Sequence, residues 1–228
     1  PTRRSSDLRV SDLQAIAAML YPDGDDKDKF WTSQARNAFL GFALYLFEHA
    51  EANDEAPTPT LGEVLRLASG DGGELKPYLQ RLARAPFLGA QARTAFAGLL
   101  SQADVTFASI IGTFREPLNA FLNPVLDAAT SGNDFSFADL RRKPVSVYLV
   151  VNSDSIQTLA PLIRLFFSDL LSAMQEKDPG PDEPWPVMIM LDEFNRLGKM
   201  PIVVESIETL RTYRGHLAIV TQTIPALD

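Results

Sequence analysis

Two adjacent carboxylates, Asp192 and Glu193, directly follow the five apolar residues Val187–Leu191. This run has the length of a β-strand and no polar alternation, which is typical of a strand covered on both faces in a parallel sheet. Ligands of such sheets bind beyond the carboxyl ends of the strands. In nucleotide hydrolases, an acid at this point organises the Mg²⁺ shell and a second acid orients water. The other interpretation, in which Asp192 caps a turn and Glu193 is solvated, is equally open from these seven residues.

The neighbouring segments predict the sheet that holds this strand. The β-branched run 145–151 is predicted as a strand, and a helix is expected over 158–175. After the acidic pair, the pattern predicts a helix over 201–213 and a third apolar strand over 216–220. Such alternation is the signature of a parallel sheet with right-handed crossovers. Three strands that are all covered on both faces make an incomplete domain, so we expect part of a larger α/β domain.

A phosphate-binding loop of the form Gly-x-x-x-x-Gly-Lys-[Ser/Thr] would complete a nucleotide site, because its backbone cradles the phosphates. The sequence does not contain this loop. Its only Gly-Lys pair, at 198–199, is followed by Met200, and the position five residues before Gly198 is Glu193 rather than glycine. The chain therefore supplies the acidic half of a nucleotide site, and we expect the phosphate loop upstream of Pro1 if nucleotide is bound at all.

The first part of the chain predicts helices and no convincing strand. The strongest helical pattern covers 30–50, which is apolar nearly all round and therefore belongs at the centre of a bundle. Ser11 with Gln14, and Thr60 with Glu63, have the spacing of capping boxes and predict two helix starts. Further helices are expected over 75–84, 90–102 and 104–114.

These patterns divide the chain into parts of different class. We predict an all-α domain over 11–135 and the α/β part over 136–228, with 1–10 as the end of a segment that precedes the helical domain.

The net charge of −8 is concentrated in the first part of the chain. Between Ser11 and Leu140 there are nine lysines and arginines against seventeen acidic residues, whereas the rest of the chain is balanced. An acidic surface repels phosphate backbones and favours basic partners, although solubility alone explains such an excess equally well.

Composition limits the remaining classes of site. The chain contains no cysteine, which excludes disulfides and thiolate metal sites and fits a cytoplasmic protein. Its two histidines lie on different predicted elements, which argues against a histidine zinc site. No apolar run approaches the roughly 20 residues that span a bilayer, so no membrane span is predicted.

The sequence resembles the type IV secretion coupling proteins, the TraG-like hexameric ATPases of bacterial conjugation and effector export. The resemblance covers nearly the whole chain, and its most specific matches surround the acidic pair, at 191–194, 197–201, 211–215 and the strand ending in 221–222. Weaker matches occur at 30–31, 35–36, 142–144, 147–149 and 161–166.

The resemblance implies a fold and a set of catalytic roles. An all-α domain would be inserted into a RecA-like ATPase domain after its phosphate loop, with this chain ending in the second half of that domain. Asp192 would organise Mg²⁺ through water, Glu193 would activate water, and Gln222 would sense the γ-phosphate. Arg211, or alternatively Arg214, would reach a neighbouring subunit's site as an arginine finger. Without the resemblance, both arginines are more simply solvated residues at a helix end.

The resemblance also implies cofactors, partners and a location. ATP and Mg²⁺ would serve the intact protein, whereas this chain by itself would require neither and would be inactive. The intact protein would be a homo-hexamer at the cytoplasmic face of the bacterial inner membrane, and this chain a monomer. The helical domain would recruit relaxase, with DNA in the intact protein, or effector export signals, and would meet other secretion components. The acidic excess leads to the hypothesis that Asp25, Asp26 and Glu55 attract basic export signals.

Two alternatives remain open. One is a related FtsK/HerA-like DNA-pumping motor of chromosome segregation or phage packaging, although such motors usually lack a large helical insert. The other is a non-hydrolysing substrate adaptor whose acids are structural, against which an upstream phosphate loop would count strongly.

Overall fold

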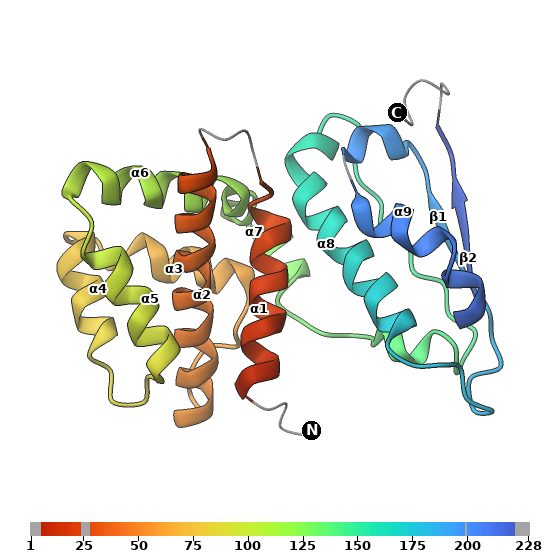
Figure 1. Cartoon of the computed structure of the whole chain (residues 1–228), viewed down its shortest axis with the longest axis horizontal. Helices are drawn as coiled ribbons and strands as arrows, with labels where there is room; N and C mark the ends of the chain where they lie inside the picture. Colours follow the sequence, from red (N-terminus) through yellow and green to blue (C-terminus); the bar gives the residue numbers. More distant parts are fainter. Residues whose placement is uncertain (1–5, 24–27, 199, 222–228) are drawn as a thin grey trace. The chain divides into compact units, whose positions relative to one another are not determined.

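The computed structural model describes residues 6–23, 28–198 and 200–221 (Figure 1). Its contacts divide the chain into two units, Pro1–Gly132 and Asn133–Asp228. The first, called the helical unit, contains only helices among its described residues, and the second, called the α/β unit, combines helices with a parallel pair of strands.

The helical unit is organised around one long central helix. Its elements are α1 (Ser6–Leu20), α2 (Lys29–Ala52), α3 (Leu61–Ser69), α4 (Leu75–Ala83), α5 (Ala90–Leu100), α6 (Asp104–Arg115), the 3₁₀ helix η1 (Glu116–Leu122) and α7 (Pro124–Ala129). Helix α2 packs against α1, α3, α5 and α6 (Figure 1). Its all-round apolar pattern predicted this central position, which the packing confirms.

Aromatic side chains fill the core of the helical unit. Phe42 of α2 is fully buried and lies between Phe96 and Phe114, with ring centroids 5.5 and 5.2 Å from its own. The buried Tyr21 at the end of α1 donates a hydrogen bond of 2.8 Å to the carbonyl oxygen of Phe114. The ring of Tyr21 therefore adds to the apolar core while its hydroxyl keeps a partner.

One of the two predicted caps is confirmed and the other is wrong. Thr60 precedes α3, and its Oγ1 accepts a hydrogen bond of 3.1 Å from the backbone N–H of Glu63. Ser11, in contrast, lies inside α1, which already begins at Ser6. A Ser-x-x-Gln pair caps a helix only where the backbone before it leaves the helical conformation, and no glycine or proline interrupts 6–10.

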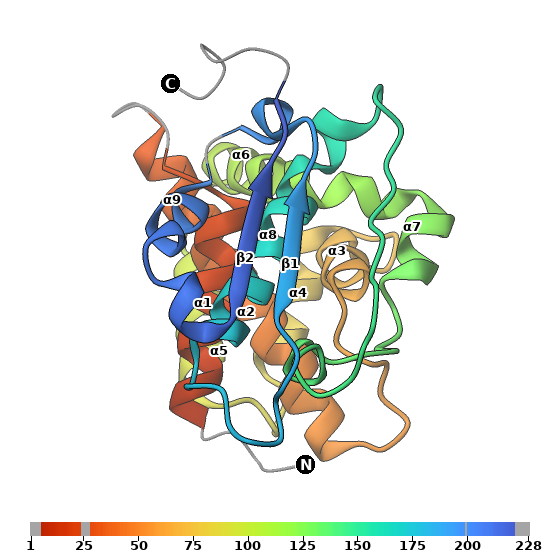
Figure 2. The ribbon, with the colours of Figure 1, turned by 90° about the vertical axis from the view of Figure 1, so that its right-hand side faces the viewer.

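The α/β unit contains a two-stranded parallel sheet. Its elements are η2 (Phe137–Asp139), α8 (Ile156–Gln175), β1 (Val187–Leu191), η3 (Phe194–Leu197), α9 (Pro201–Ile207), η4 (Leu210–Tyr213) and β2 (Gly215–Ile219). Strand β1 pairs with β2 in parallel, with Val187 opposite Gly215 and Leu191 opposite Ile219 (Figure 2). Two of the three predicted strands are therefore confirmed.

The third predicted strand, 145–151, is not a strand in the structure, so this prediction was wrong. The segment has no strand assignment, and its side chains are largely exposed, with Tyr148 at 84% and Val150 at 86%. A β-branched run favours extended backbone, but a strand forms only where a neighbour accepts and donates the ladder hydrogen bonds. Among the described residues, β1 pairs with β2 alone.

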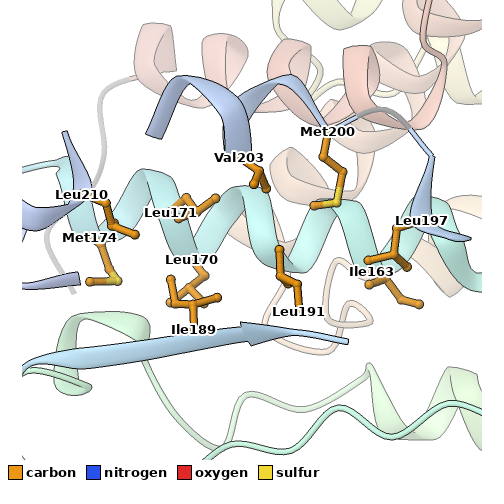
Figure 3. Close-up of a cluster of buried hydrophobic side chains, with 10 residues drawn as sticks. All are labelled: Ile163, Leu170, Leu171, Met174, Ile189, Leu191, Leu197, Met200, Val203 and Leu210. Carbon is orange, nitrogen blue, oxygen red and sulfur yellow. The ribbon is translucent and has the colours of Figure 1, made fainter. Parts of the chain in front are cut away.

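One face of the sheet carries the core of the α/β unit. Figure 3 shows Ile189 and Leu191 of β1 directed toward α8, where Leu170 and Leu171 belong to the same buried cluster. Helix α8 is long and apolar enough to span a membrane by length and composition, and in this fold it contributes buried side chains to the core of the α/β unit. The opposite face of β1 is open, since Met190 is 65% exposed.

Candidate functional site at the carboxyl end of β1

The chain turns sharply where β1 ends, and this turn presents the two acids. Asp192 Oδ1 accepts a hydrogen bond of 2.9 Å from the backbone N–H of Glu193. Glu193 itself has left-handed backbone angles, with φ 49° and ψ 40°. A non-glycine residue in this region costs about 1–2 kcal/mol, so the surrounding structure must hold it there. Asp192 therefore caps the turn, as one of the two interpretations predicted. Its second carboxylate oxygen has no partner among the described residues.

Backbone hydrogen bonds past the strand ends hold this turn in place. The N–H of Val220 donates to the carbonyl oxygen of Leu191 at 2.8 Å, and the N–H of Phe194 donates to the carbonyl oxygen of Val220 at 3.2 Å. The side chain of Thr221 lies 3.5 Å from that of Asn195. Residues that follow β1 and β2 therefore meet at the same edge of the sheet. Gln222 lies outside the described residues, and its predicted sensor role stays a prediction.

Two arginines that the sequence analysis did not single out contact this turn. Arg196 NH1 forms an ion pair of 2.7 Å with Glu193 Oε2. Arg164 of α8 donates from NH1 to the carbonyl oxygen of Leu197 at 3.0 Å, and burial lowers the pKa of this guanidinium from its ordinary value. The sequence held a signal for Arg164, because a lone cation within an apolar helix needs a partner.

A glycine permits the close approach of Arg164. Gly198 has φ 72°, and a Cβ atom there would lie 3.2 Å from Arg164 NH1. Both the backbone conformation and the space therefore favour glycine at this position.

The two acids open onto a small pocket. Asp192 and Glu193 line a cavity of about 340 Å³, together with Ser153 and otherwise apolar side chains from 149–151, α8, β1 and η3. Its volume lies at the lower end of the range of about 300–1,000 Å³ that is typical of ligand pockets. None of its lining residues is basic. The pocket thus offers carboxylates for a cation but no side-chain cation for a phosphate.

The sheet topology separates Arg211 from the acids. Asp192 follows the carboxyl end of β1, whereas Arg211 in η4 precedes the amino end of the parallel strand β2. Five residues of strand span about 17 Å, so the structure does not bring Arg211 to the carboxylates of its own chain. The Arg211 side chain is exposed and makes no hydrogen bond or ion pair with another described residue.

Arg214 already has a structural partner. Its NH1 donates a hydrogen bond of 2.7 Å to the carbonyl oxygen of Glu183, and its backbone is left-handed, with φ 57°. Of the two arginines that the sequence offered as a finger, Arg211 is therefore the one whose guanidinium is available.

A buried ion cluster holds the amino end of the sheet. Arg141, with 4% exposure, donates from NH1 to the carbonyl oxygens of Met174 and Tyr213, at 3.0 and 3.1 Å. Its NH2 lies 3.2 Å from a carboxylate oxygen of the fully buried Glu183. Lys177, 3.0 Å from Glu183, lowers the pKa of that carboxyl. This cluster ties α8, η4 and the loop before β1 together.

Of the three acidic residues predicted to attract export signals, the structure describes only Glu55. Asp25 and Asp26 lie outside the described residues. Glu55 belongs to the exposed loop after α2, where its backbone N–H donates a hydrogen bond of 3.1 Å to Asn53 Oδ1. Their role in binding stays a prediction.

Comparisons with known proteins show which family the chain resembles. The family model described as type IV secretory system conjugative DNA transfer matches residues 2–228. VirD4 of Rhizobium radiobacter is 36% identical over 196 residues, which cover 85% of this chain and 27% of that protein. TraG of Escherichia coli is 25% identical over 240 residues, which cover 99% of this chain and 37% of that protein. The chain thus spans well under half the length of these relatives.

Solved structures show the same fold. The plasmid coupling protein TrwB, in complex with the ATP analogue ADPNP, matches with a TM-score of 0.62 and 19% identity, over 96% of this chain and 48% of that one. TrwB in complex with ADP and Mg²⁺ matches with the same TM-score at 18% identity. The predicted fold class, an all-α domain followed by part of a RecA-like domain, is confirmed by this likeness.

Proposed function

Because the chain belongs to the type IV secretory system conjugative DNA transfer family, we propose that it is part of a coupling protein that hydrolyses ATP. In the proposal, hydrolysis drives the transfer of relaxase with its DNA, or of effector proteins, through a type IV secretion system. The observation that carries the proposal is the pair Asp192 and Glu193, which lines a pocket at the carboxyl end of a parallel strand. This is where ligands of such sheets bind.

The donor set fits a magnesium ion. Mg²⁺ usually binds through one or two protein carboxylates and keeps several waters alongside substrate phosphates. Asp192 and Glu193 provide such carboxylates, and among the described residues no cluster of three or more metal-binding side chains competes with them. Bound Mg²⁺ would neutralise charge that develops on the phosphates. Asp192 is proposed to hold it through water.

The remaining steps belong to groups of this chain. Glu193 is proposed to orient the attacking water with its carboxylate, and Gln222 to contact the γ-phosphate. Arg211 is proposed to act on the site of a neighbouring subunit, because the length of the sheet separates it from the acids of its own chain. This arrangement requires an adjacent subunit, and for the intact protein we propose a homo-hexamer at the cytoplasmic face of the inner membrane.

The decisive experiment measures ATP hydrolysis by the full-length gene product. Glu193→Gln is expected to lower kcat by at least about 100-fold, the lower end of the range for losing a group that handles protons in the transition state. ATP binding should persist, as measured by a fluorescent nucleotide analogue. If Glu193→Gln hydrolysed ATP at the wild-type rate, Asp192 and Glu193 would have only a structural role. That result would favour the non-hydrolysing adaptor.

We further propose that the predicted all-α domain, 11–135, receives the secretion substrate. The support is its acidic excess, which suits basic export signals. Reversing Asp25, Asp26 and Glu55 to lysine together should weaken binding of a relaxase or effector, and wild-type binding should weaken as salt rises. Affinity that ignores both changes would contradict recruitment by charge.

A further inference from the structure

The ion pair between Glu193 and Arg196 determines how the proposed catalytic carboxylate is held. Glu193 Oε2 lies 2.7 Å from Arg196 NH1, and the two side chains are 31% and 37% exposed. Among the described residues, neither side chain has another hydrogen-bond or ion-pair partner. The pair is therefore the one described interaction that orients this carboxylate.

The backbone of the turn sets this pair in place. The N–H of Arg196 donates a hydrogen bond of 2.9 Å to the carbonyl oxygen of Glu193, which closes one turn of η3. The left-handed conformation of Glu193 redirects the chain as it leaves β1, and Asp192 holds the N–H of Glu193. Residues three apart on such a turn lie on the same side of it, so the two side chains meet without a long-range contact.

The pair does not lie wholly in the pocket. Glu193 lines the cavity beside Asp192, but Arg196 is not one of its lining residues. The guanidinium thus holds one carboxylate oxygen at the turn, and a water that entered the pocket would compete with it for that acceptor.

We propose that Arg196 is a positioning residue that restrains Glu193 in a resting orientation, and that the pair opens when Glu193 orients water beside bound nucleotide. This inference rests on the proposed function. Because the pair is partly exposed and water screens it, the restraint is weak. Arg196 would thus slow hydrolysis modestly in the resting protein without preventing it.

Steady-state ATP hydrolysis by the full-length gene product tests the restraint. Arg196→Ala is expected to raise kcat about two- to fivefold, which corresponds to the release of one partly exposed ion pair, and to leave KM unchanged. Arg196→Lys keeps a cation and is expected to stay closer to the wild-type kcat than Arg196→Ala. A purely structural role would instead lower kcat or raise KM.

An ion pair of the same sequence spacing in the helical unit provides the control. Arg66 NH2 lies 2.8 Å from Glu63 Oε1, and Arg66 also pairs with Asp127 at 2.5 Å, far from the acids in sequence, so Arg66→Ala should leave kcat unchanged. Circular dichroism spectra establish that each variant is folded. If Glu193→Gln abolishes hydrolysis while Arg196→Ala leaves kcat equal to or below wild type, the restraint is overturned and the proposed function stands. Hydrolysis that persists in Glu193→Gln overturns both.

Discussion

The two units differ in how fully they bury the apolar side chains of their central elements. In the helical unit, Phe39, Phe42, Phe96 and Phe114 are all buried. In the α/β unit, one face of β1 is buried against α8, whereas Met188 and Met190 on the other face are 64% and 65% exposed. Helices make their backbone hydrogen bonds locally and can close a core with their neighbours along the chain. A sheet depends on partners distant in sequence, so the part of it present here exposes a face and an edge.

The largest expected effect tests this difference between the cores. Phe42→Ala should cost about 3–5 kcal/mol of unfolding free energy, because it leaves a cavity between Phe96 and Phe114. Met190→Ala, at an exposed position, should change the free energy by less than about 0.5 kcal/mol. Urea denaturation followed by circular dichroism measures both. Equal costs would mean that the open face of β1 is covered in solution.

An effect of intermediate size is expected when acidic pH destabilises the α/β unit. Lys177 lowers the pKa of Glu183 from its ordinary value of 4.5. The ion cluster therefore stabilises the α/β unit fully above that value, and the stabilisation is lost as pH falls through the lower pKa of the folded state. We expect the α/β unit to melt at progressively lower temperature as the pH falls below about 5.

Glu183→Gln provides the comparison for the acid experiment. In this variant the same acidification should lower the melting temperature of the α/β unit less than in the wild type. The substitution removes the carboxyl group whose pKa is lowered in the folded state. Differential scanning calorimetry follows the transition. A variant with the wild-type pH dependence would show that Glu183 does not carry it.

The smallest expected effect separates the real helix cap from the false one. Thr60→Ala should cost about 1 kcal/mol, because it removes the hydrogen bond to the N–H of Glu63 at the start of α3. Ser11→Ala should not destabilise the helical unit, because Ser11 lies inside α1 and alanine favours helix. Thermal melting of the two variants gives the comparison. A loss in Ser11→Ala as large as that in Thr60→Ala would restore the predicted start at Ser11.

Features that depend on residues near one another in sequence were predictable. The period of apolar residues predicted α2 and its central place, and the spacing of Thr60 and Glu63 predicted the cap of α3. The run Val187–Leu191 and the acids behind it predicted a strand end with two carboxylates, which the structure contains. In each case the deciding pattern, an apolar period, a cap spacing or an apolar run ending in acids, lies within one short stretch of sequence.

Tertiary structure decided what depends on a partner elsewhere. The segment 145–151 has the composition of a strand, but it has no paired neighbour among the described residues. Arg211 and Arg214 are close in sequence, yet Arg214 bonds to the carbonyl oxygen of Glu183, and the direction of β2 places Arg211 away from the acids. Composition and spacing determined which groups this chain has available for chemistry. Strand pairing and long-range hydrogen bonds, which no local pattern encodes, decided which of those groups meet.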